Sequence, residues 1–113
     1  MQQYKFGEVI LCKVPFAEVE GEKTRPVMVL DENEHQVRVV YASSQKVDGI
    51  PRRGEFHITD KAEMAAMGHT KPARYSFDRG GELWVPKSEI IKRLGQTPQT
   101  VLVRAFRAAK QMY

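Results

Sequence analysis

Short apolar runs separated by charged turns dominate the first half of the chain and predict β-strands. The run GEVILCKVPF (7–16) predicts a first strand that ends near a Pro-Phe pair. The runs RPVMVLDE (25–32) and HQVRVVYA (35–42) flank a polar turn and predict a β-hairpin. Apolar and polar positions alternate in the third run, as in a half-buried strand. The second run is apolar on both faces, which predicts a central place in the sheet.

The second half mixes strand and helix patterns. After a loop rich in glycine and arginine, the segment EFHIT (55–59) predicts a short strand. The next residues predict one or two helical turns, with Asp60 as N-cap and Gly68 as the stop signal. The segment ARYSFDRGGELWVP (73–86) predicts a second hairpin that turns at its Arg-Gly-Gly sequence.

Two further helices are predicted to close the chain. KSEIIKRLG (87–95) predicts a short one, and the last opens with Thr97 as N-cap and Pro98 at its first position and runs to Tyr113. Apolar residues at helical spacing form a stripe on the last helix that is expected to pack on the strands: Val101, Leu102, Ala105, Phe106, Ala109 and Met112. A basic face is expected to be solvated: Arg104, Arg107 and Lys110.

These elements predict the fold class. Several short strands and few helices in 113 residues predict one domain spanning residues 1–113, without internal repeats. We expect a mainly β architecture, a small and strongly bent antiparallel barrel or double sheet with a C-terminal helix. A composition of 42% hydrophobic and 28% charged residues is typical of a folded domain.

The net charge of +4 is spread unevenly. Residues 1–50 carry six Lys/Arg and eight Asp/Glu (6 − 8 = −2), and residues 51–113 carry twelve and six (12 − 6 = +6). A basic half attracts polyanions without selecting a sequence. The single cysteine, Cys12, lies in an apolar run, which predicts a core residue in a reducing cytoplasm. Neither a membrane span nor a signal peptide is predicted.

Most familiar catalytic signatures are missing from the chain. It contains no G-x-S-x-G, no P-loop, no H-E-x-x-H and no cysteine pair. Of the three histidines, His35 falls in a predicted turn and His57 in a predicted strand, and only His69 lies beside a basic loop and is kept as a candidate. The carboxylates of DENE (31–34) suit a turn, so no metal and no other cofactor is predicted.

Arg25 and Ser43 carry the main chemical hypothesis. Pro26 biases Arg25 toward an extended backbone and favours the start of a strand, which places the guanidinium at the lip of the sheet. In an antiparallel hairpin the start of one strand lies beside the end of the next, so Arg25 and Ser43 are expected to be neighbours. An arginine beside a hydroxyl suits a phosphate on which negative charge is building. Further candidate substrate-binding residues are Glu22, Ser44, Gln45, Arg52, Arg53, His69, Lys71 and Arg74.

Two stretches resemble a known family. GEVILCKVPFAEVEGEKTRPVMVL, followed by VVYASSQK, resembles the opening of the MazF/PemK family of toxin–antitoxin ribonucleases, and HTKPARYSFDRGGELWVPKSEIIKRLGQ resembles its later part. The resemblance implies an SH3-like barrel of the PemK/CcdB kind, a homodimer, and an acidic disordered antitoxin as partner. It also implies metal-independent RNA cleavage, in which a 2′-hydroxyl attacks the adjacent phosphate and leaves a cyclic phosphate. Arg25 would then stabilise the pentavalent phosphorane and assist proton transfer, and Ser43 would donate to a phosphate oxygen.

The chain also departs from the family pattern. Glu8 stands where aspartate is commoner, and Ser43 replaces threonine. Serine keeps the hydroxyl but loses the methyl group that restricts its rotamer, which predicts lower activity or none. An alternative is a non-catalytic barrel that binds nucleic acid or protein. A third hypothesis, a gyrase poison on a related fold, is disfavoured because such a poison needs neither the arginine nor the hydroxyl.

Overall fold

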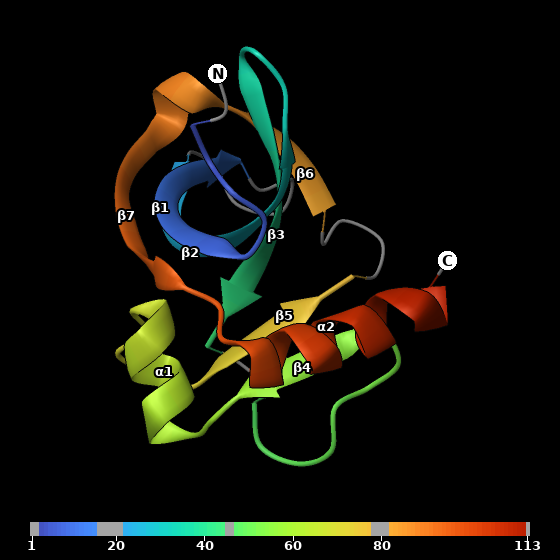
Figure 1. Cartoon of the computed structure of the whole chain (residues 1–113). Coiled ribbons are helices and arrows are strands. Elements are labelled where there is room, and N and C mark those ends of the chain that lie inside the picture. Colours follow the sequence, from blue (N-terminus) through green and yellow to red (C-terminus); the bar gives the residue numbers. More distant parts are fainter. Residues whose placement is uncertain (1–2, 16–21, 45–46, 78–81, 113) are drawn as a thin grey trace.

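Seven antiparallel strands and two α-helices make up the part of the chain that the structure describes (Figure 1). This computed structural model describes residues 3–15, 22–44, 47–77 and 82–112, with the backbone alone at residues 14, 15, 22, 23 and 82. The elements follow in the order β1 (Glu8–Pro15), β2 (Glu22–Glu32), β3 (Gln36–Ser43), β4 (Glu55–Ile58), α1 (Lys61–Met67), β5 (Ala73–Ser76), β6 (Glu82–Pro86), the 3₁₀ turn η1 (Lys87–Glu89), β7 (Ile90–Gln96) and α2 (Gln99–Met112).

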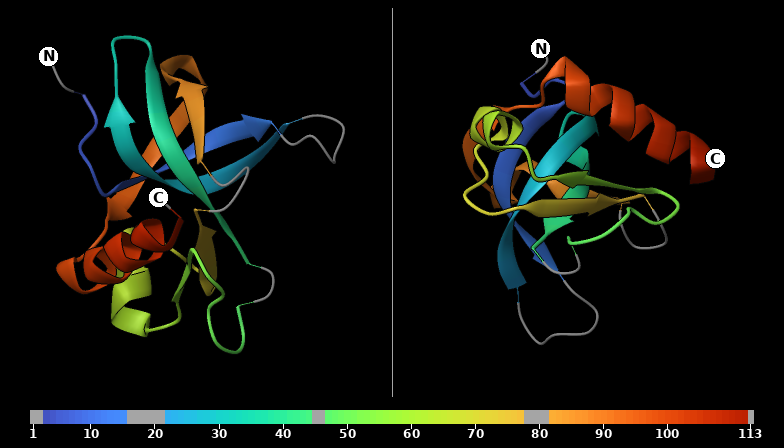
Figure 2. Two further views of the ribbon diagram at one scale, coloured as in Figure 1. Left: turned by 90° about the vertical axis from the view of Figure 1, so that its right-hand side faces the viewer. Right: turned by 90° about the horizontal axis from the view of Figure 1, so that it is seen from below.

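β3 connects the two parts of the sheet. One of its sides pairs with β2, while on the other side residues 36–40 pair with β6 and residues 42–43 with β5. β4 adds to β5, and β1 lies between β2 and β7. The long strands curl into a small barrel, and β4, β5, α1 and α2 lie together at one end of it (Figures 1 and 2). The predicted mainly β class with a C-terminal helix is confirmed.

The central strands are buried on both faces because they separate two apolar cores. In β2, Val27 and Val29 join the core inside the curled strands, whereas Met28 between them joins the core under the helices. Cys12 belongs to the inner core, as predicted, and burial raises the pKa of its thiol to about 11. The second core includes Phe56, Tyr75, Met67 and Val101, from strands and helices alike.

Two predictions for the second half are wrong. In the described parts of this segment, residues 73–77 and 82–86, the strands β5 and β6 each pair with β3 and are not the two arms of a hairpin. The predicted Arg-Gly-Gly turn lies outside the described residues. Residues 87–95 form a 3₁₀ turn and the strand β7 in place of a helix. β7 pairs with β1. The hydrogen bonds along the edge of β1 favour a strand here more strongly than the local helix propensity favours a helix.

The predicted ends of α1 are confirmed, whereas the predicted start of α2 is wrong. α1 has the predicted caps: Asp60 accepts a hydrogen bond from the Glu63 N–H, and Gly68 is left-handed with φ +77°. α2 begins later than predicted, because Pro98 O accepts the first helical hydrogen bond, from Leu102 N at 3.0 Å. The Thr97 hydroxyl is buried without a hydrogen bond to any described residue, so it is not the N-cap.

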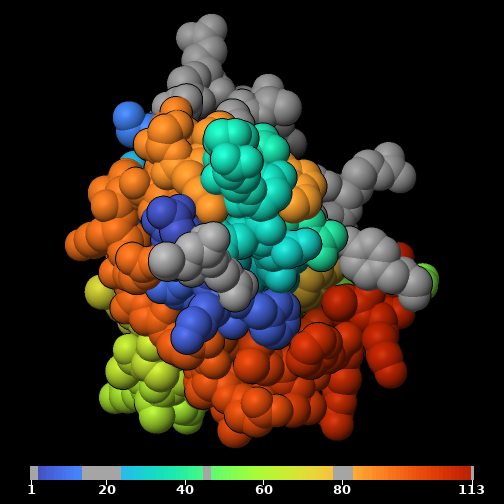
Figure 3. Space-filling view, turned by 45° about the horizontal axis from the view of Figure 1, so that its top comes forward, coloured from blue at the N-terminus to red at the C-terminus, as the bar shows by residue number. Residues whose placement is uncertain are grey.

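The faces of α2 also differ from the prediction. Val101, Ala105 and Ala108 are buried, whereas Phe106 of the expected stripe is 56% exposed. Phe106 stacks on Phe6 with ring centroids 5.6 Å apart, and Figure 3 shows the N-terminal segment against α2. Arg104, expected in solvent, donates to both carboxylate oxygens of Glu63.

α1 packs directly against β7. A Cβ atom on Gly95 would lie 2.2 Å from the backbone oxygen of Ala66, and one on Gly68 would lie 2.5 Å from the oxygen of Leu94. Both positions therefore require glycine, and this contact fixes where the chain leaves α1 toward β5. Neither described helix has the length and hydropathy needed to cross a membrane.

Candidate functional site

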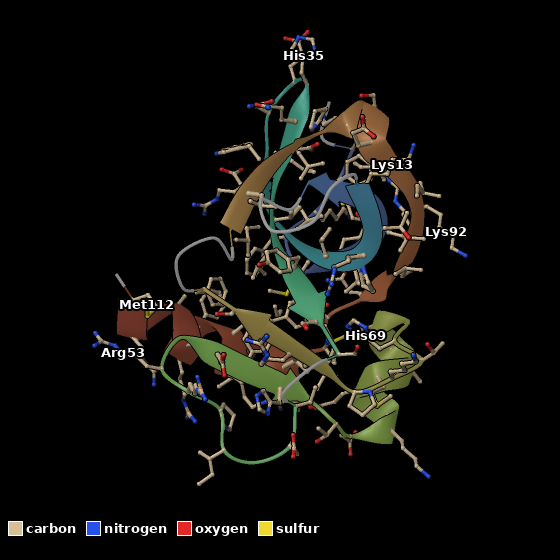
Figure 4. All side chains as sticks on the ribbon, turned by 180° about the vertical axis from the view of Figure 1, so that it is seen from behind. Lys13, His35, Arg53, His69, Lys92 and Met112 are labelled. Atoms are coloured by element: carbon tan, nitrogen blue, oxygen red, sulfur yellow. The ribbon has the colours of Figure 1, made fainter. Side chains whose placement is uncertain are left out.

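A pocket of about 330 Å³ opens where three segments meet. Its lining comes from residues 24–26 of β2, residues 42–44 at the end of β3, and residues 68–73 between α1 and β5. His69, labelled in Figure 4, lies where the end of β3, α1 and β7 come together. The three segments are remote in sequence, so the pocket exists only in the folded chain.

Arg25 and Ser43 both line this pocket. Arg25 Nη1 donates to the backbone oxygen of Ala42 at 3.3 Å, which holds the half-buried guanidinium beside the end of β3. The predicted proximity of Arg25 and Ser43 is therefore confirmed. Their roles in catalysis stay a prediction.

The placement of Arg25 at the start of a strand is wrong. β2 begins at Glu22, so Arg25 and Pro26 lie within it. Pro26 pairs with Leu11 of β1, and the pairing of β2 with β3 runs from Val27 to Glu32. Proline is tolerated at this position because it lies beyond the end of the β3 ladder, where a missing N–H costs little.

His69 lines the pocket and is tied to the core behind it. Its Nε2 atom shares a hydrogen bond of 2.8 Å with the hydroxyl of Tyr75, and its backbone N–H donates to Met64 O at 2.8 Å. Tyr75 is fully buried and stacks on Phe56, with ring centroids 5.0 Å apart. Burial lowers the pKa of His69 and raises that of Tyr75. A neutral imidazole next to a neutral phenol results.

Sequence reasoning missed Tyr75 as the partner of His69. A signal was present, because Ala73, Tyr75 and Phe77 alternate with polar residues and are all buried. This alternation places the Tyr75 side chain on the core face of β5. Its convergence with His69, however, depends on the turn that follows Gly68.

Ser44 and Lys71 also line the pocket, and both are exposed. Lys71 adds a second positive charge to the pocket, on a long side chain. The structure therefore brings together five of the predicted site residues: Arg25, Ser43, Ser44, His69 and Lys71. Gln45 and the side chain of Glu22 lie outside the described residues.

The other three predicted arginines do not line the pocket, and their role in binding a substrate stays a prediction. Arg53 Nε donates to Gln111 O at 2.8 Å, so Arg53 is held at the end of α2. Arg52 is exposed in the loop before β4. Arg74 is the cross-strand partner of Ser43, but its Nη1 atom donates to Glu55 Oε2 at 2.8 Å.

Glu55 organises the charged face of β4 and β5. Its carboxylate lies 2.8 Å from Arg74 Nη1 and 3.8 Å from His57 Nε2, and Arg52 N donates to it at 3.1 Å. Burial acts to raise the pKa of Glu55, but these hydrogen bonds and charges outweigh burial, so the pKa is lowered. An ionised Glu55 therefore keeps Arg74 on this face.

Over the described ranges, no group of three or more His, Cys, Asp or Glu side chains is placed to hold a metal ion. In comparisons with known proteins, no family model matches the chain and no curated protein matches it.

Proposed function

We propose that this protein is an endoribonuclease toxin of the MazF/PemK type that cleaves single-stranded RNA in the cytoplasm without a metal ion. The observation that supports the proposal is the convergence of Arg25, Ser43, His69 and Lys71 on one pocket. Its volume of about 330 Å³ falls within the range of small-ligand sites, roughly 300–1,000 Å³.

The proposed reaction is an internal transfer at phosphorus. The 2′-oxygen of the substrate loses its proton and attacks the adjacent phosphorus, the bond from phosphorus to the 5′-oxygen breaks, and the 5′-oxygen takes up a proton. A 2′,3′-cyclic phosphate and a 5′-hydroxyl result. Negative charge builds on the phosphate oxygens in the transition state, so preorganised donors accelerate this step.

Each pocket residue has a role in this reaction. Arg25 supplies paired N–H donors and a positive charge, and its guanidinium is oriented by Ala42 O. Ser43 donates its hydroxyl to a phosphate oxygen, a contact of the kind worth about 3–4 kcal/mol in a transition state. Burial lowers the pKa of His69, so the ring is neutral near pH 7, and in the tautomer whose Nε2 donates to Tyr75 its Nδ1 atom would accept the proton of the 2′-hydroxyl.

The proposal includes two partners beside RNA, a second copy of the chain and an acidic antitoxin. The exposed stack of Phe6 and Phe106 offers an apolar surface for the second copy. The excess positive charge of residues 51–113 (12 − 6 = +6) favours an acidic protein as the other partner.

RNA cleavage in excess EDTA tests the proposal. Purified protein is expected to convert single-stranded RNA to fragments with cyclic phosphate ends, and Arg25→Ala is expected to abolish this while the circular dichroism spectrum stays unchanged. Arg107→Ala is the matched control, because Arg107 is exposed on α2. Full activity of Arg25→Ala would overturn the assignment.

A non-catalytic RNA-binding barrel is the second candidate. It is favoured by the half-buried position of Arg25 and by the use of one guanidinium nitrogen for Ala42 O, which leaves fewer donors for a phosphate. Such a protein would bind RNA with an affinity that falls as salt rises, and it would form no cyclic phosphate.

A further inference from the structure

A second hollow, of about 640 Å³, adjoins the pocket. The two share Ser44, Lys71 and Pro72 in their linings. The remaining walls of the second hollow are Val47 and Asp48, which follow β3, and Thr59, which follows β4. Because these three residues line both hollows, the two are neighbours with Lys71 at their junction, and together they are called the groove.

The two parts of this groove differ in chemistry. The first contains Arg25, His69 and Lys71, and its lining includes no carboxylate among the described residues. The second contains Asp48 as its acidic group, and Asp48 is exposed. A carboxylate facing an RNA phosphate is repelled, so an RNA strand in the groove must present a different group to Asp48.

Of the hydrogen-bond donors that an RNA strand carries, the ribose offers a single 2′-hydroxyl, whereas a nucleobase edge can offer two donors side by side. A carboxylate only accepts hydrogen bonds, and its two oxygens match two neighbouring donors. Among the four bases, guanine alone has adjacent donors on its Watson–Crick edge, at N1–H and the N2 amino group. The edges of adenine, cytosine and uracil place an acceptor next to each donor, which would face the carboxylate unfavourably.

The other walls fit a base as well. Val47 and Pro72 give apolar surface for the faces of a ring, and Thr59 adds a hydroxyl. Lys71 at the junction is placed to hold the phosphate that links this base to the cleaved position. Single-stranded RNA is recognised in this manner, through splayed bases read on their edges.

We propose that the second hollow is a base-binding subsite next to the cleaved phosphate and that Asp48 selects guanine there. The inference rests on the proposed ribonuclease function. Asp48 is thus a specificity-determining residue, and Lys71 anchors the strand regardless of the base.

The test uses short RNA substrates that differ in one base beside the cut. We expect wild type to cleave the guanine substrate faster than the adenine substrate, and Asp48→Asn to reduce that ratio by about tenfold or more, as is usual for loss of a bidentate base contact. A substrate with inosine, which lacks the N2 amino group, should be cleaved more slowly than the guanine substrate by wild type. Asp48→Asn should cleave the inosine and guanine substrates at the same rate. Lys71→Met should slow all substrates alike.

Glu34→Gln is the matched control, since it removes the same charge from the β2–β3 turn, where the Glu34 side chain is 88% exposed. It should leave the guanine ratio unchanged. An equal ratio in wild type and Asp48→Asn overturns the inference while the nuclease assignment stands.

A binding experiment separates the two proposals. The Arg25→Ala variant is titrated with guanine and adenine oligonucleotides, with and without Asp48→Asn. If the wild type cleaves no RNA but guanine is bound more tightly than adenine and Asp48→Asn removes this difference, the base-binding subsite is supported and the nuclease assignment is rejected. Binding without any such preference would reject the subsite.

Discussion

The Nε2 atom of His69 lies 2.8 Å from the hydroxyl of Tyr75, and this hydrogen bond joins the wall of the pocket to the core. The Tyr75 ring is held in turn by Phe56, which stacks on it at an interplanar angle of 4°. The orientation of His69 is therefore set by residues that cannot contact a substrate.

We expect Tyr75→Phe to destabilise the fold by about 1–2 kcal/mol, because the ring still packs but a buried histidine nitrogen loses its partner. Urea unfolding monitored by circular dichroism measures this difference. Tyr4→Phe is the control, because the Tyr4 ring contacts Arg93 near the surface. Equal stability of Tyr75→Phe and wild type would show that the hydrogen bond contributes nothing net.

The lowered pKa of His69 predicts a pH dependence of stability. The ordinary value is 6.5 and the native pKa lies below it, so between the two values the unfolded chain binds a proton that the native protein does not. The free energy of unfolding should therefore decrease as the pH falls from 6.5 toward the native pKa, and be insensitive to His69 above that window. Unfolding by urea at a series of pH values measures the slope, and His69→Gln should reduce it.

Glu63 links α1 to α2. It accepts hydrogen bonds from Thr100 Oγ1 and Arg104 Nη2, both at 2.7 Å. Because the Arg104 side chain is 37% exposed, solvent screens its interaction with Glu63. We therefore expect Glu63→Ala to lower the free energy of unfolding by only about 1 kcal/mol. A double-mutant cycle with Arg104→Ala, followed by thermal unfolding, measures the coupling.

The same pair predicts a loss of stability in acid. The hydrogen bond from Arg104 lowers the pKa of Glu63 below its ordinary 4.5. The unfolded chain therefore takes up the proton first, and the contribution of Glu63 should decline as the pH falls below about 4.5. Additive effects of the two substitutions at neutral pH would contradict this account.

The contact of α1 with β7 predicts that Gly95→Ala is strongly destabilising. The new methyl group would meet the backbone of Ala66 and Met67, which cannot move aside without shifting α1, and we expect a cost of about 2–3 kcal/mol or more. Gly49→Ala is the comparison, because Gly49 has φ +94° but open space around it. That change should cost only about 1 kcal/mol of backbone strain. Similar midpoints for both variants in thermal unfolding would refute the steric argument.

If the protein is a ribonuclease, Ser43→Ala should reduce the cleavage rate about 10²- to 10³-fold, because one transition-state donor is lost. Ser43→Thr should retain or raise the rate, since threonine adds the methyl group that restricts the hydroxyl. Single-turnover cleavage of a defined RNA measures both. Ser88→Ala, on the exposed side of η1, controls for loss of a serine elsewhere. A Ser43→Ala rate equal to wild type would remove Ser43 from the mechanism.

Local signals in the sequence were sufficient for part of this structure. The strands β1 to β3 and their turn follow from apolar periodicity, and α1 follows from Asp60 and Gly68, because a cap and a stop act within one turn of the helix. The proximity of Arg25 and Ser43 follows from hairpin geometry, which is also a local relation.

Tertiary contacts decided the rest. Residues 90–96 became a strand because the edge of β1 needed a partner, and β6 joined β3 because β3 had a free side. His69 met Tyr75, and Arg53 turned to the end of α2, through contacts between segments whose packing no short pattern encodes. The sequence by itself determined which residues are apolar, capped or charged, whereas only the folded chain decided which of them share a pocket, because that depends on the pairing of segments remote from one another.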